Sequence, residues 1–146
     1  MTLARITLFV AAALAVLVAV PVAMGARLSG GTQYIGETAR GEDVTLRLSG
    51  DARRVARLRI NYELKCANGD SGKTYTVIMN ARLRGERHTF RATGRYTGSR
   101  DGSTNRFTVE GRVSRRGARG TFSLVNTQDE DVRCTTGKLR WRAVRR

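Results

Sequence analysis

The alternation of apolar and polar residues constrains the fold of this chain more than any other feature of its sequence. In the stretch LRINYELKC, residues 58–66, every second residue is apolar, and the residues between them are charged or carry an amide. Side chains of a β-strand point alternately to its two faces, so this period gives one dry face and one wet face. The same period recurs in nearly every segment after residue 32, without a convincing helical period. The sequence therefore predicts an all-β domain.

Eight such segments are separated by short links, of which Gly85-Glu86 has the form of a two-residue hairpin turn. They comprise the residues before a turn at 40–42 and the ranges 44–48, 58–66, 75–83, 90–96, 107–113, 122–124 and 139–143. Short links favour contacts between consecutive strands. We therefore predict an eight-stranded antiparallel meander that closes as a barrel or folds over as a sandwich. The barrel is favoured, because closure removes exposed strand edges.

The first 26 residues have the features of a secretory signal peptide that forms an N-terminal signal helix. Arg5 supplies a positive start, residues 6–20 are apolar except for Thr7, and Pro21 precedes small residues that suit a signal peptidase. The apolar run is also long enough to remain as an uncleaved membrane anchor. We expect cleavage, a short linker at 27–31, a single β domain at 32–146, and a secreted or cell-envelope location.

The two cysteines, Cys66 and Cys134, lie about 68 positions apart. In an exported chain, two cysteines predict one disulfide. Closing a loop of that length stabilises a fold by about 4 kcal/mol in the chain-entropy model. Redox or metal-binding thiols are the disfavoured alternative, because the cysteines lack Cys-x-x-Cys spacing and His88 is the single histidine.

The chain carries a formal net charge of +15, and arginines alternate with the apolar residues of most predicted strands. Such a surface creates a positive potential that attracts polyanions, and the planar guanidinium binds both oxygens of a phosphate or carboxylate. Anionic cell-wall polymers and membrane surfaces are the expected partners; the alternative is that the charge only maintains solubility. No recognition helix is predicted, which disfavours sequence-specific binding of nucleic acid. The candidate polyanion-binding residues are Arg57, Arg59, Arg82, Arg84, Arg91, Arg95, Arg140 and Arg142.

The predicted inward positions carry most of the aromatic side chains. The direct interpretation is a hydrophobic core. The alternative is a calyx for a small apolar ligand, since glycines such as Gly94 and Gly111 share the inward positions and leave space beside the rings. The candidate calyx residues are Tyr62, Tyr75, Phe90, Tyr96, Phe107 and Trp141.

No arrangement of residues predicts catalysis. His88 next to a hairpin turn has no evident nucleophile to activate, and the adjacent acidic residues 129–131 resemble a solvated turn more than an acid–base pair. Neither NGDSG at 68–72 nor the acidic turn has the spacing of a calcium loop. We therefore expect a non-enzymatic β domain without a cofactor or metal, which associates electrostatically with anionic cell-envelope polymers. A small-ligand carrier is the alternative.

Four stretches carry a resemblance to a known group of proteins: YIGETARGEDVTLRLSG, INYELKCANG, VEGRVSRRGARGTF and CTTGKLRWRA. Together they resemble a largely uncharacterised family of small exported β proteins of high-GC Gram-positive bacteria. The resemblance covers most of the chain after the leader. Its motifs are turns, a disulfide and an aromatic core position, so it implies a fold and transfers no activity and no functional residue.

Overall fold

The computed structural model describes residues 27–98, 102–128 and 132–146, which form an antiparallel β structure. The predicted all-β class is confirmed. The predicted signal helix at 1–26 and the acidic residues 129–131 lie outside the described residues. Within the described part, no helix is long and apolar enough to cross a membrane. The strands are β1 (Gln33–Thr38), β2 (Asp43–Leu48), β3 (Arg54–Cys66), β4 (Ser71–Arg82), β5 (Thr89–Thr97), β6 (Thr104–Val113), β7 (Gly117–Gln128), β8 (Val132–Thr135) and β9 (Leu139–Arg145).

Six of these strands close into a barrel. β3 pairs with β2, β2 with β1, β1 with β9, and β9 with β7. The short strand β8 pairs with both β7 and β3, so the ring returns to its start. β4 extends the sheet beside β3, and β6 and β5 extend it beside β7. The predicted closure as a barrel is confirmed, with additional strands on both flanks.

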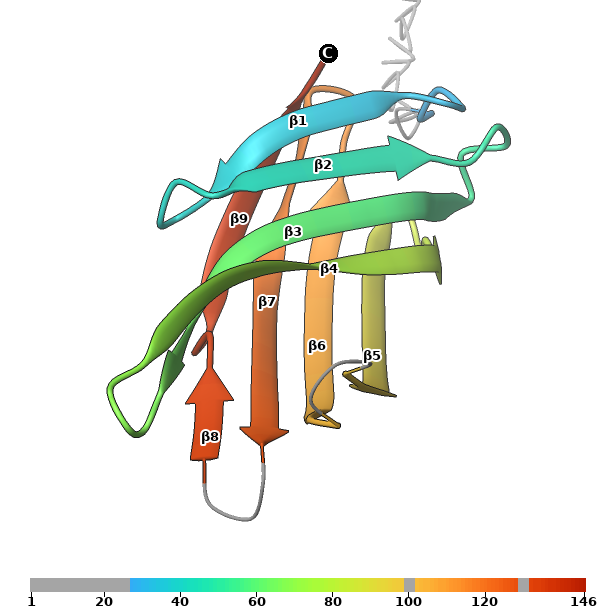
Figure 1. The fold of residues 1–146 in the computed structure, drawn as a ribbon. Coiled ribbons are helices and arrows are strands. Elements are labelled where there is room, and N and C mark those ends of the chain that lie inside the picture. The colour runs from blue at the N-terminus through green and yellow to red at the C-terminus, as the bar shows by residue number, and fades with distance from the viewer. Residues whose placement is uncertain (1–26, 99–101, 129–131) are drawn as a thin grey trace, which may run out of the picture.

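Two layers result from this strand order. Figure 1 shows β1 to β4 crossing over a second layer made of β9, β7, β6 and β5. The pairing of β1 with β9 joins the layers on one side. On the other side, β4 and β5 end the strand order and are linked by one isolated bridge, Arg84 with Thr89. A hydrogen bond of 3.3 Å between Thr76 Oγ1 and Tyr96 Oη also connects them.

The connectivity differs from a simple meander in the last third of the chain. β9 pairs with β1 and β7, and β8 pairs with β7 and β3. β8 is a ninth strand that the sequence analysis did not predict, because its four residues, VRCT, are too few to display an alternating pattern. The disulfide between Cys66 and Cys134 joins directly opposed positions of β3 and β8. The predicted pairing of the cysteines is therefore confirmed, and it lies where β8 closes the ring.

The core fills the space between the layers with the side chains of alternate positions. Val44, Leu58 and Ile60 are completely buried. The Tyr62 and Phe122 rings pack with centroids 5.1 Å apart, which brings β3 of one layer against β7 of the other. Burial of each large apolar side chain stabilises the fold by about 1.5–3 kcal/mol.

The alternation changes phase in β3 and β4, and this overturns one prediction. Tyr75 and Met79 are 52% and 58% exposed, whereas the intervening Ile78 points into the core. The register between β2 and β3 shifts at this level, and Asn80 of β4 has a φ of 56°. Side chains on the two sides of such an irregularity follow opposite alternation, so Tyr75, before Asn80, does not share a face with the buried Ala81 after it. The prediction that Tyr75 points inward is therefore wrong.

Candidate polyanion-binding face

The candidate site is the outward surface of β5, β6 and β7. Phe90, Val109 and Phe122 are buried at alternate positions of these strands, and the positions in the opposite phase face this surface. Apart from Glu110 and Val125, they are arginine, threonine or serine. We call this surface, with Arg140 and Arg142 of β9, the basic face. It consists of Thr89, Arg91, Thr93, Arg95, Thr97, Thr104, Arg106, Thr108, Glu110, Arg112, Arg119, Thr121, Ser123, Val125, Thr127, Arg140 and Arg142.

The pairing register places three arginines in one row across the basic face. Arg142 of β9 lies opposite Arg119 of β7, and Arg119 lies opposite Arg112 of β6. Neighbouring strands are about 4.8 Å apart, so these three side chains leave the sheet within about 10 Å of one another. Like charges in directly opposed positions repel and destabilise a sheet. The row therefore concentrates positive charge at a cost to the fold.

A groove of about 1170 Å³ runs across this end of the basic face. The row of Arg142, Arg119 and Arg112 forms one side of the groove, and the next row, with Gly120 and Gly111, forms its floor. The following row forms the other side, and its members are Arg140, Thr121, Glu110 and Arg91. Six arginines and two glutamates line the groove in total, so its net charge is strongly positive.

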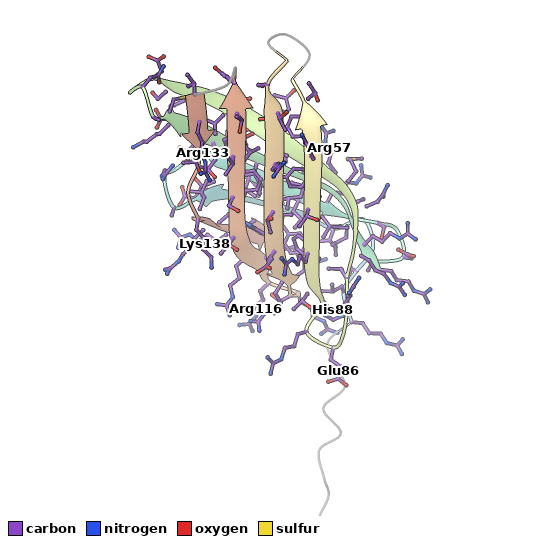
Figure 2. All side chains as sticks on the ribbon, turned by 90° about the horizontal axis from the view of Figure 1, so that it is seen from below. Arg57, Glu86, His88, Arg116, Arg133 and Lys138 are labelled. Atoms are coloured by element: carbon purple, nitrogen blue, oxygen red, sulfur yellow. A yellow bond between two sulfur atoms is a disulfide. The ribbon has the colours of Figure 1, made fainter. Side chains whose placement is uncertain are left out.

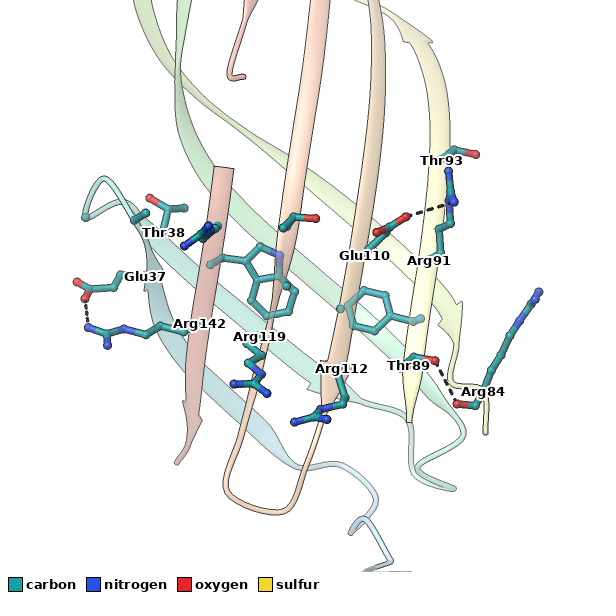
Figure 3. A pocket seen from close by; sticks show the side chains of 18 residues that line it. Glu37, Thr38, Arg84, Thr89, Arg91, Thr93, Glu110, Arg112, Arg119 and Arg142 are labelled. Atoms are coloured by element: carbon teal, nitrogen blue, oxygen red, sulfur yellow. Dashed lines mark hydrogen bonds and ion pairs between the residues drawn. The ribbon is translucent and has the colours of Figure 1, made fainter. Parts of the chain in front are cut away.

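Only part of this charge is neutralised within the described residues. Arg142 Nη2 donates to Glu37 Oε1 at 3.1 Å, and Arg91 Nη1 lies 3.2 Å from Glu110 Oε1. Both pairs are exposed, and each contributes less than about 1 kcal/mol to stability. Arg112 and Arg119 make no ion pair with any described residue; Figure 3 shows them side by side and extended in the same direction. Both guanidinium groups are thus available to an external anion.

A second cleft, of about 590 Å³, lies at the other end of the same face. Arg95 of β5 and Arg106 of β6 are directly opposed there, as Arg112 and Arg119 are in the groove. Arg133 of β8 also lines this cleft, beside Thr127 of β7. The basic face therefore carries arginine pairs at both ends.

The predicted polyanion-binding residues divide between the two layers. Arg84, Arg91, Arg140 and Arg142 line the groove, and Arg95 lines the second cleft. Three others belong to the opposite layer, where Arg57 and Arg59 lie on β3 and Arg82 ends β4. Arg59 packs over the Tyr75 ring at 4.1 Å from its centroid. The structure thus brings five of the eight candidates onto or beside the basic face.

Four arginines of the groove and the second cleft were not among the predicted residues: Arg112, Arg119, Arg106 and Arg133. The alternation within β6 predicts that Arg106 and Arg112 point outward. Which arginines of neighbouring strands lie beside them depends on the cross-strand register, and a single strand does not reveal that register. Arg119 lies between the predicted strand segments 107–113 and 122–124, although GARG begins β7. Buried Ala118 and Phe122 on either side were the signal that could have placed Arg119 outward.

Five of the six candidate calyx residues keep inward positions, and the space beside them is filled. A Cβ built on Gly111 would lie 2.7 Å from the Phe90 ring and 2.8 Å from the Trp141 ring, and one on Gly94 would collide with the Phe107 ring. The inward glycines therefore receive aromatic rings and do not leave room for a ligand. Tyr96 is 39% exposed at the edge formed by β5. Phe90 and Trp141 also line the groove, but each is only 3% exposed, so the two rings belong to the core and present little surface to a ligand.

Tyr62, another candidate calyx residue, is held in the core by a hydrogen bond. Its hydroxyl lies 2.8 Å from Thr76 Oγ1, and Thr76 also contacts the Tyr96 hydroxyl. Burial raises the pKa of the Tyr62 hydroxyl well above its ordinary value of 10.0, against a smaller opposing effect of the hydrogen bond with Thr76. The polar groups that connect β3, β4 and β5 are thus satisfied by one another.

Within the described residues, no group of three or more histidine, cysteine or carboxylate side chains is arranged to hold a metal ion. His88 lies in the turn between β4 and β5 with a φ of 47°. Figure 2 places it beside Glu86 at the tip of that turn. The groove and the second cleft are two hollows of the described residues where charged side chains gather, and in both of them most of these side chains are arginines.

Comparison with protein-family models, with curated proteins and with solved structures found no match to this chain. The candidate site is accordingly defined by its own geometry and charge.

Proposed function

We propose that this chain is an exported, non-enzymatic β domain that associates with anionic polymers of the cell envelope through its basic face. The observation that carries the proposal is the row of Arg142, Arg119 and Arg112, in which two guanidinium groups have no carboxylate partner among the described residues. The opposed charges destabilise the free protein. A bound polyanion supplies negative charge beside the row. The repulsion between the arginines then decreases, and this relief contributes to the free energy of binding.

The chemistry of the groove supports the same class of ligand. Arginine binds phosphate and carboxylate through two parallel hydrogen bonds, and the walls of the groove also present threonine hydroxyls from Thr89 and Thr121. The disulfide between Cys66 and Cys134 is consistent with an oxidising environment outside the cytosol. An exported basic protein meets wall polymers and anionic membrane surfaces there, and the groove favours a polymer because its arginines lie in a concave site.

Retention on a polyanion tests the proposal. The chain without residues 1–26 is applied to immobilised teichoic acid, and the salt concentration required for elution is measured. Retention should weaken strongly between about 50 mM and 500 mM sodium chloride, because screening shortens the range of charge interactions. Retention that does not change with salt would rule out electrostatic association.

Matched variants locate the binding surface. The double variant R112T/R119T removes an opposed arginine pair from the basic face, and R47T/R57T removes an equivalent opposed pair from β2 and β3. Both lower the net charge by two, and threonine is well tolerated in strands. The first variant should elute at clearly lower salt than the second. Equal shifts would mean that net charge alone controls retention and that the basic face is not the site.

A further inference from the structure

We infer that the polyanion binds lengthwise along β5, β6 and β7, so that one linear phosphate polymer contacts the groove and the second cleft together. This inference rests on the proposed function and adds a direction, a minimum length and a ligand class. β5 and β6 each contribute an arginine to both clusters, Arg91 and Arg112 at the groove and Arg95 and Arg106 at the second cleft. Figure 2 shows these strands side by side, with Arg133 toward one end and Arg116, in the β6–β7 turn, at the other.

The register fixes the separation of the two clusters. On β6, Arg112 belongs to the groove and Arg106 to the second cleft. Six residues of extended strand span about 20 Å. Arg119 accompanies Arg112 on β7, and Arg95 accompanies Arg106 on β5. A ligand shorter than about 20 Å therefore reaches one arginine pair, and a longer linear ligand reaches both.

The surface between the clusters suits a phosphate chain. Its central row consists of Thr93, Thr108 and Ser123, which are directly opposed on the three strands. Hydroxyl groups donate hydrogen bonds to phosphate oxygens, as arginines do. The one carboxylate on β5 to β7, Glu110, is already paired with Arg91. A polymer laid along the strands thus passes from arginine to hydroxyl to arginine.

A path across the strands is less favourable. It would follow the row of Arg112, Arg119 and Arg142 and then meet the carboxylate of Glu37 on β1. Beyond Arg112, the row ends at Thr89 of β5. Each path meets one paired carboxylate, Glu37 beside Arg142 on the crosswise path and Glu110 beside Arg91 on the lengthwise path. The crosswise path offers one arginine cluster, whereas the lengthwise path offers two.

The ligand class is a linear phosphodiester polymer, and its binding does not require nucleic-acid bases. Binding of single-stranded nucleic acid usually depends on aromatic side chains that stack on bases. The outward positions of β5 to β7 carry no aromatic residue in the part of the chain that the structure describes. We therefore expect a polyol phosphate to bind the basic face as tightly as a nucleic acid with the same number of phosphates.

Affinity for graded polyglycerol phosphate fragments tests the inference. Fragments on both sides of about 20 Å are titrated into the chain without residues 1–26, and the dissociation constant is measured at low salt. The wild type should show at least a tenfold gain in affinity once fragments exceed that length, because the second cluster then binds at a high effective concentration. Oligothymidylate with the same number of phosphates should bind no more tightly.

Two variants and one control separate the inference from the proposed function. R112T/R119T and R95T/R106T each remove one opposed arginine pair of the basic face, and each should abolish the length-dependent gain; R47T/R57T should retain it. For oligothymidylate, losing two phosphate contacts should reduce the slope of log affinity against log salt by about 1.4. Circular dichroism and thermal melting verify that every variant is folded.

The outcomes are distinct. Salt-dependent binding without a length-dependent gain, or a gain that survives in both basic-face variants, would overturn lengthwise binding while leaving the proposed function intact. Absence of salt-dependent binding to every fragment would overturn both. A marked preference for oligothymidylate, or for an acidic polysaccharide of equal length and charge, would overturn the assignment of a polyol phosphate.

Discussion

At the scale of single residues, the inward glycines of β6 and β7 determine how the core and the groove fit together. A Cβ on Gly120 would overlap the Glu110 carbonyl oxygen and lie 2.7 Å from the Trp141 ring. The same backbone forms the floor of the groove between two arginine rows. Glycine therefore lets an indole ring pack against the inner side of the backbone and leaves the outer side open to the groove.

Replacement of Gly120 by alanine should destabilise the fold. The neighbouring atoms belong to the backbone of β6 and to a buried ring, which cannot move without disturbing the core, and such overpacking costs about 1–3 kcal/mol. The matched control is Gly72→Ala on β4, where a Cβ meets no atom within 4 Å and φ is not positive. Urea unfolding measures both, and an equal effect of the two substitutions would contradict this packing argument.

The buried tyrosines predict a loss of stability in alkali. Burial raises the pKa of Tyr62 and of Tyr34 in the folded state, so the unfolded chain releases these protons first as pH rises. The stabilising contribution is complete below the ordinary pKa of 10.0 and decreases above it, by up to about 1.4 kcal/mol per pH unit for each tyrosine. Urea unfolding between pH 9 and 11.5 measures this slope, and Tyr62→Phe should make it shallower. An unchanged slope would contradict the assignment to Tyr62.

At the scale of elements, alternation predicted most strands and failed where a strand is irregular or short. The rings of Tyr62, Phe90 and Trp141 occupy the predicted inward positions because the residues around each ring alternate without interruption. In β3 the change of phase lies between Val55 and Leu58, before this stretch.

Tyr75 does not occupy its predicted inward position, because the phase of β4 changes between Ile78 and Ala81, where Asn80 has a positive φ. The local pattern does not predict such a residue. The arginine rows were unpredictable for a related reason: the pairing partner of each strand depends on the whole sheet.

β8 is the element most dependent on a covalent bond. Its four residues close the ring between β3 and β7, and Cys134 ties them to Cys66. The double variant C66A/C134A should lose about 2–4 kcal/mol of unfolding free energy, and amide exchange should accelerate most in β8. Hydrogen exchange measured residue by residue checks this prediction. Uniform acceleration along all strands would show that the disulfide stabilises the barrel globally and not its closure.

At the scale of the whole molecule, the two layers differ in the balance of acidic and basic side chains. The layer of β1 to β4 carries Glu37, Asp43 and Glu63 among its arginines and exposes the apolar side chains of Tyr75 and Met79. The basic face carries Glu110 as its single carboxylate on β5 to β7. Under the proposed function, we expect the molecule to present the basic face to the polymer and the β1–β4 layer away from it.

The same asymmetry makes the fold sensitive to ionic strength. With a formal charge of +15 on the full chain and opposed arginines at both ends of the basic face, self-repulsion lowers stability when salt is scarce. Raising sodium chloride from about 10 mM to 150 mM shortens the screening length from about 30 Å to 8 Å. The melting temperature of the chain without residues 1–26 should then rise by about 4 °C, which corresponds to about 1 kcal/mol for a domain of this size.

The arginine variants show which charges produce this effect. R112T/R119T removes two members of a three-arginine row, so at low salt it should melt above the wild type and gain less from added salt than R47T/R57T, which removes one opposed pair. The variant that binds polyanions most weakly should thus be the more stable protein. If R112T/R119T instead melts below the wild type at low salt, the row stabilises the free fold, and it would no longer indicate a surface that requires an anionic partner.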